Sequence, residues 1–182
     1  MKKLLLLLLC VPVIGLGQQT WEKNFGGAEG DRGYSVQQTT DGGYIITGRT
    51  YSFGNGEFDV YLMKTDVNGD SLWAKNYGGA DYDFGHSVQQ TTDGGYITTG
   101  YKEPFSGDYG NVYLIKTDGN GVQQWDQIFG GTAIGYHSEG SQVQQTTDGG
   151  YIITGLTESS GSNDIYLIKT DGNGNVTSEF TI

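Results

Sequence analysis

Three copies of one ten-residue phrase, Val-Gln-Gln-Thr-Thr-Asp-Gly-Gly-Tyr-Ile, constrain what this chain can fold into. The copies begin at Val36, Val88 and Val143. Repeats with a period of about 20 to 50 residues are typical of solenoids, propellers and arrays. Trp21, Trp73 and Trp125 also recur, at intervals of 52 residues. The repeating unit is therefore longer than the phrase and has the length of a whole supersecondary module.

Each unit has the pattern of four β-strands joined by tight turns. Its apolar residues alternate with period two, and the runs are rich in Val, Ile, Tyr and Thr, which favour pleated strands. In the first unit we expect strands at Tyr34–Thr39, Tyr44–Arg49, Asp59–Thr65 and Ser71–Asn76. The Asp-Gly-Gly and Asp-Val-Asn-Gly turns are too short for a crossover helix and supply the positive φ that hairpins need. Each unit is therefore predicted to be an antiparallel meander.

The third strand of each unit is apolar on both faces. In the first unit Val60 and Leu62 point to one side, and Tyr61 points to the other. A sheet that is apolar on both faces must be covered on both, which indicates propeller blades or a stacked β-solenoid. A glycine recurs in the second strand, at Gly48, Gly100 and Gly155. Glycine inside a strand indicates the close approach of a neighbouring backbone.

Two motifs carry a resemblance to known repeat families. The segments Lys64–Trp73 and Lys116–Trp125 resemble the tryptophan-docking repeat of quinoprotein-type β-propellers. The whole unit is similar to the Asp-Gly-Gly-Tyr repeat arrays of large secreted bacterial proteins, often exported by type IX secretion. These resemblances imply the architecture of the chain and its export. Quinoprotein enzymes add cofactor and calcium ligands that have no recognisable counterpart here, so no quinoprotein chemistry is implied.

The fold expected is all-β, with three tandem four-stranded antiparallel propeller-like blades of about 52 residues in an open arc or partial propeller. Propellers close with about 4 to 8 blades, and this chain supplies three. An orphan fourth strand is predicted at Thr20–Phe25, before the first blade, and the last strand at Val176–Ile182 has Ser178 where Trp is expected. The leading strand either closes a ring on the last blade or leaves an open arc with unprotected edges.

Residues 1–17 have the pattern of a secretory signal peptide. Two lysines precede an apolar run from Leu4 to Ile14, and Gly15 and Gly17 have the spacing of a cleavage site. This apolar run is shorter than the roughly 20 residues that a membrane-spanning helix needs. We therefore expect export, with the mature protein secreted, on the outer cell surface or in the periplasm.

The mature domain is expected to span residues 18–182, with repeats at about 21–72, 73–124 and 125–182. The only cysteine of the chain, Cys10, lies in the leader. The mature domain therefore has neither a disulfide framework nor a thiolate metal site. Loss of the two leader lysines would take the formal net charge from −11 to −13. Such an acidic chain repels nucleic acid and anionic lipid surfaces.

The Asp-rich turns and the lysines that precede them invite chemical roles, but their pattern favours structure. The turns lie at Asp66–Asp70, Asp118–Gly121 and Asp171–Asn175. Their glycine is fourth and strands flank them, whereas a helix-flanked calcium loop has its glycine sixth, so we expect hairpins whose Asp and Asn bond their own backbone. A lysine recurs at Lys64, Lys116 and Lys169. Because one functional site rarely needs a residue in every blade, we expect each lysine to pair with a turn aspartate, and we predict no metal and no cofactor.

Catalytic groups are sparse in the sequence. Outside the leader the only nucleophile-activating candidates are His86 and His137, and there is no thiol. His86 aligns with a tyrosine and a serine in the other units, so we expect a surface-loop histidine. Asp81, Asp83 and Glu139 could supply a carboxylate pair for glycoside hydrolysis, although any acidic loop offers such pairs. We predict no catalytic residue.

Aromatic residues gather in the loops rather than in the repeated turns. In a four-strand meander the turns after strands one and three lie at one end, and the loops after strands two and four lie at the other. Every length change between repeats falls at this loop end. It carries the predicted ligand-binding residues Tyr51, Phe53, Phe58, Tyr82, Phe84, Phe105, Tyr109, Tyr136 and His137. Rigid turns opposite varied aromatic loops are typical of a binding scaffold, although unconstrained loops would vary as well.

We therefore expect a non-catalytic secreted or cell-surface protein that acts in display, adhesion or ligand binding. The expected partner is a glycan or a surface protein, and homo-oligomers are expected because three blades leave open edges. The alternatives are a carbohydrate-binding or polysaccharide-degrading accessory protein and a quinoprotein-like enzyme fragment. A binder should have clustered loop aromatics, whereas an enzyme needs converging acid, base or cofactor groups.

Overall fold

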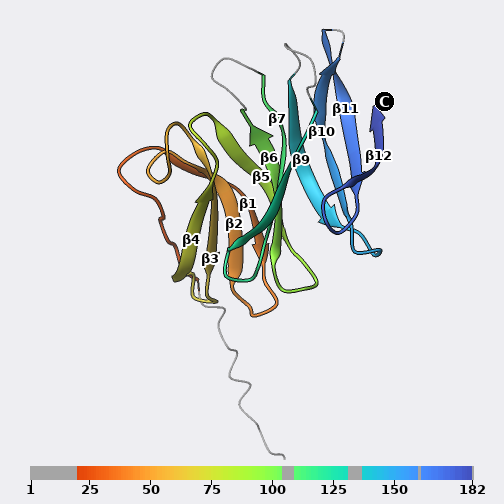
Figure 1. Cartoon of the computed structure of the whole chain (residues 1–182). Coiled ribbons are helices and arrows are strands. Elements are labelled where there is room, and N and C mark those ends of the chain that lie inside the picture. The colour runs from red at the N-terminus through yellow and green to blue at the C-terminus, as the bar shows by residue number, and fades with distance from the viewer. Residues whose placement is uncertain (1–19, 104–108, 131–136, 160, 182) are drawn as a thin grey trace, which may run out of the picture.

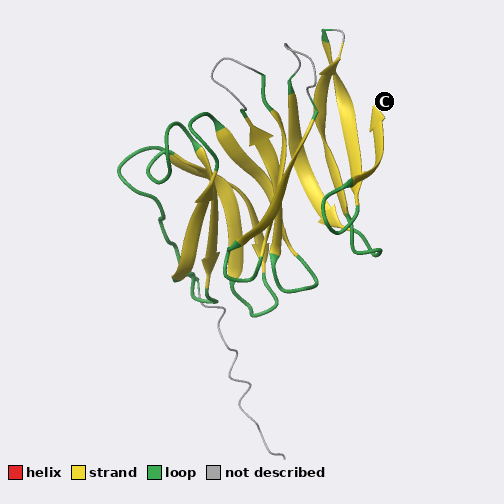
Figure 2. Cartoon of the chain, in the orientation of Figure 1, coloured by secondary structure: helices red, strands yellow, loops and turns green. Residues whose placement is uncertain are grey.

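The protein is an all-β array of three separate four-stranded sheets, as the sequence predicts (Figure 1). The computed structural model describes residues 20–103, 109–130, 137–159 and 161–181, and the secondary structure of this part consists of strands (Figure 2). Blade A contains β1 (Asp31–Gln38), β2 (Tyr44–Thr50), β3 (Asp59–Thr65) and β4 (Ser71–Tyr77). Blade B contains β5 (Asp83–Gln90), β6 (Tyr96–Lys102), β7 (Asn111–Thr117) and β8 (Gln123–Phe129). Blade C contains β9 (Ser138–Gln145), β10 (Tyr151–Ser159), β11 (Ser162–Thr170) and β12 (Val176–Thr181).

Each blade is an antiparallel meander in which neighbouring strands follow one another along the chain. The three sheets lie side by side along an open arc, with the repeated turns at one end and the longer loops at the other (Figure 1). Each hydrogen-bonded sheet begins about ten residues after the start of the corresponding sequence repeat. In blades A and B the fourth strand therefore reaches into the start of the next repeat, whereas β12 of blade C lies within the third repeat. The described residues include no helix long and apolar enough to cross a membrane.

Two hydrophobic cores hold the blades face to face. The core between blades A and B contains Ile45, Val60, Leu62, Tyr77, Val88, Tyr96, Tyr113 and Ile115. The core between blades B and C contains Ile97, Val112, Leu114, Phe129, Val143, Tyr151, Ile153, Tyr166 and Ile168. Along β7, Val112 and Leu114 face blade C while Tyr113 and Ile115 face blade A. The prediction that the doubly apolar third strand is covered on both sides is confirmed in blade B.

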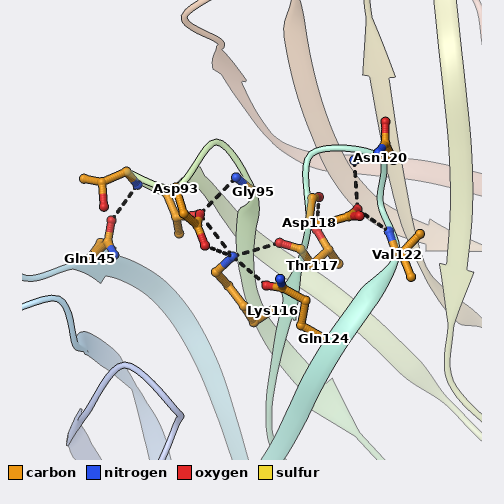
Figure 3. Close-up of polar contacts among 11 residues, drawn as sticks. Asp93, Gly95, Lys116, Thr117, Asp118, Asn120, Val122, Gln124 and Gln145 are labelled. Atoms are coloured by element: carbon orange, nitrogen blue, oxygen red, sulfur yellow. Dashed lines mark hydrogen bonds and ion pairs between the residues drawn. The ribbon is translucent and has the colours of Figure 1, made fainter.

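A lysine holds the turn of the repeated phrase in each blade, and it is buried in blades A and B and partly buried in blade C. In blade B, Lys116 is 3 % exposed, and its ammonium donates to the Asp93 carboxylate at 2.9 Å and to the Thr117 carbonyl at 2.8 Å (Figure 3). It also donates to Oε1 of Gln124 at 3.0 Å. The corresponding ion pairs, Lys64 with Asp41 and Lys169 with Asp148, are 2.9 Å long as well. The prediction that the recurrent lysine pairs with a turn aspartate is confirmed.

The turn aspartate of the phrase accepts hydrogen bonds from the lysine and from its own turn. Burial raises the pKa of the Asp93 carboxyl, but hydrogen bonds from Thr91, Lys116 and the Gly95 backbone outweigh it and hold the pKa at about 2. At Gly95 a Cβ would lie 2.2 Å from the Thr117 carbonyl oxygen and 2.6 Å from the Lys116 ammonium nitrogen. The second glycine of the phrase is therefore needed because a side chain does not fit at its position. The first, Gly94, is needed because its φ of 83° lies in the left-handed region that favours glycine.

The glutamines of the phrase connect one blade to the next. The Gln90 backbone N–H donates to Oε1 of Gln37 at 2.6 Å, and Oε1 of Gln90 accepts from the Thr40 backbone N–H at 2.9 Å. Between blades B and C the same two bonds join Gln145 to Gln89 and to Thr92. We call this arrangement the glutamine clasp. Its repetition at both contacts explains why a polar pair recurs inside a phrase that is otherwise turn and core.

The glycine in each second strand sits against the backbone of the first strand, as expected. A Cβ at Gly48 would lie 1.8 Å from the Arg32 carbonyl oxygen, and one at Gly100 would lie 1.8 Å from that of Phe84. At Gly155 the corresponding distance is 1.9 Å, to the carbonyl of Glu139. In every blade the register between strands one and two shifts at this point, so the glycine accommodates a β-bulge.

The segment before blade A is not the strand that the sequence predicts. Residues 20–30 contain no strand, yet the Trp21 ring packs 5.7 Å from Tyr44 and against Gly69. Trp73 of β4 contacts Tyr96, at 5.8 Å, in the same manner in blade B. The tryptophan motif therefore predicts where the side chain docks. A strand also needs a partner for its backbone hydrogen bonds, and among the described residues no sheet pairs with Thr20–Phe25.

Candidate functional site

Aromatic rings at the loop end form one continuous row from blade A to the edge of blade C. We define this aromatic row as Tyr51, Phe58, Tyr82, Phe84, Tyr101 and His137. Ring centroids are 5.1 Å apart from Tyr51 to Phe58 and 6.0 Å apart from Phe58 to Phe84. They are 5.4 Å apart from Phe84 to Tyr101 and 5.5 Å apart from Tyr101 to His137. These separations are those of interacting aromatic pairs, so the rings support one another.

The meander topology brings these rings together from distant parts of the sequence. Tyr51 directly follows β2 and Phe58 directly precedes β3, while Tyr82 directly precedes β5 and Phe84 is its second residue. Antiparallel pairing places all of these strand ends at the loop end of the molecule. Tyr82 bridges the row, with centroids 6.1 Å from Phe58 and 6.2 Å from Phe84.

Arg49 stacks on two rings of the aromatic row, and Arg32 stacks on Tyr34, which lies outside the row. The Arg49 guanidinium carbon lies 4.2 Å from the centroid of Phe58 and 5.0 Å from that of Phe84. Such cation–π contacts stabilise by about 0.5–2 kcal/mol each. Arg32 lies 5.7 Å from the ring of Tyr34. Between the two arginines is an open hollow of about 180 Å³ that is also lined by Phe58.

The row is presented to solvent on one side and anchored on the other. Tyr51 is 41 % exposed and Tyr82 is 39 % exposed, whereas Phe58, Phe84 and Tyr101 are partly buried. Rings that are packed against one another lose little further rotamer freedom when a ligand binds, which lowers the entropic cost of binding. The arrangement is thus suited to contacting a flat or extended ligand.

The remaining predicted ligand-binding residues lie apart from the row or outside the described residues. Phe53 is stacked on Tyr61 with centroids 5.9 Å apart, beside an open hollow of about 190 Å³ on the outward face of blade A. Tyr109 is 53 % exposed and precedes β7. Phe105 and Tyr136 lie outside the residues that the structure describes.

Sequence reasoning missed Arg49 and Tyr101, because it searched the loops and both residues lie in second strands. A signal was nevertheless present. Each directly follows the recurrent glycine of its strand, at a position where the third unit has Leu156. A position that varies inside an otherwise repeated strand is a candidate for a role that the scaffold does not require.

His86 is not the surface-loop histidine that the sequence predicts. It lies in β5 and is partly buried, and its Nδ1 lies 3.1 Å from the carbonyl oxygen of Gly140 in β9, at hydrogen-bonding distance. Its ring also contacts Tyr34 and Phe84, at 5.5 and 6.3 Å. The unit that carries His86 extends its first strand to Asp83, so the residue falls inside the sheet and links blade B to blade C.

Two carboxylates, Asp59 and Asp83, are buried at the loop end and are 2 % and 1 % exposed. The Asn55 backbone N–H donates to Asp59 at 3.0 Å, and that of Gly79 donates to Asp83 at 2.7 Å. Burial raises the pKa of Asp83 to about 6, against the opposing charge of Lys102, whose ammonium lies 3.9 Å away. Both side chains thus tie a loop to the start of a strand, and their burial keeps substrate from reaching them.

The sequence predicts Asp81, Asp83 and Glu139 as candidate carboxylates, but not Asp59. Asp81 is partly buried in the connection between β4 and β5, and its negative charge adds to the rise in the pKa of Asp83. Glu139 lies 3.7 Å from Nε2 of His137, close to the last ring of the aromatic row. His137 and Glu139 therefore form a pair at the aromatic row, but this pair joins an imidazole to a carboxylate. Glycoside hydrolysis uses two carboxylates.

The Asp-rich turns are hairpins closed by their own aspartate, as expected. Oδ1 of Asp118 accepts the backbone N–H groups of Asn120 and Val122, both at 2.8 Å (Figure 3). The turns at Asp66 and Asp171 have the same pair of bonds. Over the part of the chain that the structure describes, no group of three or more His, Cys, Asp and Glu side chains could hold a metal ion.

No protein-family model and no curated protein matches this chain. The resemblance to Asp-Gly-Gly-Tyr arrays and to quinoprotein-type blades therefore stays an expectation from the repeated motif. A function has to be argued from the geometry of the blades and of the aromatic row.

Proposed function

We propose that this protein is a non-catalytic, exported binding module that acts in adhesion or display by binding a glycan chain along the aromatic row. The observation that carries the proposal is the row itself, which spans the loop end of the array. The repeated residues are used for blade turns, cores and clasps, whereas the row is built from residues that differ between repeats. Its conformation is fixed by ring–ring and ring–arginine contacts rather than by the fold's own repeat.

A glycan suits the row because sugar rings have flat apolar faces that stack on aromatic side chains. Tyr51 and Tyr82 expose their rings and carry hydroxyl groups that can donate and accept hydrogen bonds. His137 and Glu139 add an imidazole and a carboxylate at the far end. A row that crosses from blade A to blade C favours an oligosaccharide over a single sugar.

The test is a glycan array followed by titration of the strongest ligand. The combined variant Tyr51→Ala, Tyr82→Ala and His137→Ala should bind at least about tenfold more weakly, since each aromatic contact contributes about 0.5–1.5 kcal/mol and 1.4 kcal/mol is tenfold. Its melting temperature should stay near that of the wild type, because the two tyrosines are well exposed. The matched control is Val67→Ala with Val122→Ala, both 58 % exposed in turns at the opposite end.

Unchanged binding by the loop-end variant, or lost binding by the turn-end control, would contradict the proposal. We also expect binding without turnover. Release of reducing ends from the bound glycan, or quinone-dependent oxidation, would replace the binding proposal with an enzymatic one.

A further inference from the structure

Blade C has an apolar face that is covered in the other two blades. Ile165 on β11 is 60 % exposed, whereas the equivalent residues Val60 and Val112 are 1 % and 0 % exposed. Leu167 is likewise only partly buried. An open hollow of about 260 Å³ lies on this face between Leu167, Ile152 and the neighbouring glutamines. We call this surface, defined by Ile152, Ile165 and Leu167, the outgoing face.

Blade A leaves part of the complementary surface uncovered. Val36 on β1 is 63 % exposed, whereas the equivalents Val88 and Val143 are 6 % and 3 % exposed in the inter-blade cores. Tyr34, two residues earlier, is 40 % exposed. We call the surface of Val36 and Gln38 the incoming face. The array thus ends in two surfaces of the kind that pack on each other twice within the chain.

The polar halves of the glutamine clasp are also present on these faces. Within the chain the clasp joins a glutamine Oε1 and a threonine N–H of one blade to the second glutamine of the next. On blade C the equivalent groups belong to Gln144 and Thr147, and on blade A the equivalent of the second glutamine is Gln38. All three residues are exposed. A blade A placed on a blade C could therefore form a third clasp.

The tryptophan positions are complementary as well. Trp73 and Trp125 stand opposite Lys64 and Lys116 in the β3–β4 and β7–β8 pairs, whereas in blade C the residue opposite Lys169 is Ser178. The blade that would follow blade C needs a tryptophan on its Tyr and turn glycine. Blade A already holds one, because Trp21 of its own chain packs on Tyr44 and Gly69.

We propose that a second copy of this chain covers both faces, with the outgoing face of each copy packed on the incoming face of the other. Two head-to-tail contacts of this kind close on a two-fold axis. The product is a ring of six blades, which lies within the range of about 4 to 8 over which propellers close. It removes both open faces with the contact already used between blades A and B and between blades B and C.

Sedimentation velocity of the mature chain tests this assembly. We expect twice the chain mass at micromolar concentration. Val36→Asp and Ile165→Asp each place an unpaired charge in both contacts of the ring, so each variant alone should be monomeric, with association weakened at least about 100-fold. Val67→Asp, equally exposed but in a turn, is the control and should leave the dimer intact.

Mixing the two monomeric variants separates a head-to-tail contact from a symmetric one. In the mixture, the intact outgoing face of the Val36→Asp chain meets the intact incoming face of the Ile165→Asp chain, so a heterodimer with one contact should form. A monomeric wild type, a dimer disrupted by only one variant, no association in the mixture, or a mass that grows beyond two chains would each overturn the six-blade ring. A monomeric wild type would leave these faces to blades of another chain.

Discussion

Replacing Asp93 with alanine should destabilise the protein more than replacing Lys116 with methionine, although the two side chains form one ion pair. The reason is that the partners are unequally buried: the Lys116 side chain is 4 % exposed and that of Asp93 is 57 % exposed. Removal of Asp93 leaves an ammonium group in the protein interior with only the Thr117 carbonyl and Gln124 as acceptors (Figure 3). Removal of one partner from a buried pair costs about 3–5 kcal/mol.

Lys116→Met has a different cost. The Asp93 carboxylate stays in contact with water and keeps its hydrogen bonds from Thr91 and Gly95, so the loss of its partner costs little. The buried Thr117 carbonyl loses a donor, which costs about 1–3 kcal/mol. The double variant Asp93→Ala with Lys116→Met should therefore be more stable than Asp93→Ala alone, because it contains no buried charge.

Urea denaturation of the four proteins gives these differences as free energies of unfolding. Asp148→Ala in blade C is a matched variant, and it should cost less than Asp93→Ala because the Lys169 side chain is 25 % exposed. The reasoning fails if Lys116→Met is the more destabilising single change, or if the two single effects add in the double variant.

Four further predictions concern packing and pH. Gly100→Ala should lower the free energy of unfolding by about 1–3 kcal/mol, because its Cβ would lie 1.8 Å from the Phe84 carbonyl oxygen. Gly79→Ala has open space around it and should leave the free energy of unfolding unchanged. Thermal unfolding of both variants measures these effects. Leu114→Ala should cost about 2–5 kcal/mol and Leu167→Ala less in dilute solution, since only Leu114 lies in an inter-blade core; equal losses would mean that blade C is covered in the monomer. Burial raises the pKa of Asp83 from 3.8 to about 6 on folding, so the folded state binds the proton more tightly and the melting temperature should rise as pH falls from 7 to 5. Asp83→Asn should flatten this rise, and an unchanged slope would show that Asp83 does not titrate in that window. The turn carboxyls of Asp41 and Asp93 have pKa values of about 2, so the stability that they contribute is lost only below about pH 4.

Most of the fold could be predicted because the same strand pattern, turn residues and buried positions recur in three units of the sequence. The alternation along Val112 to Ile115 predicts a strand apolar on both faces, and in blade B this strand packs against a neighbouring blade on each side. The recurrent glycine predicts a close backbone contact and the recurrent lysine predicts an ion pair, and Gly100 and Lys116 confirm both predictions.

The errors arise where a motif specifies a side-chain contact rather than a backbone conformation. Trp21 keeps its docking site on Tyr44 but not its strand, because backbone pairing requires a neighbouring edge. Phe53 is two residues from Tyr51, yet it stacks on the outward face of blade A and leaves the row. Arg49 and Tyr101 belong to the site but lie in strands, where a search of loops does not look.

The central claim is a division of labour between a repeated turn end that holds the blades and a varied loop end that binds. One paired alanine scan of surface residues at both ends, with melting temperature and glycan affinity measured for every variant, tests it most directly. The account predicts that Asp41, Asp93 and Asp148 variants lower the melting temperature of the protein and leave glycan affinity unchanged. Tyr51 and Tyr82 variants should weaken glycan binding and leave the melting temperature unchanged. Affinity that follows the turn aspartates in variants that remain folded would contradict it.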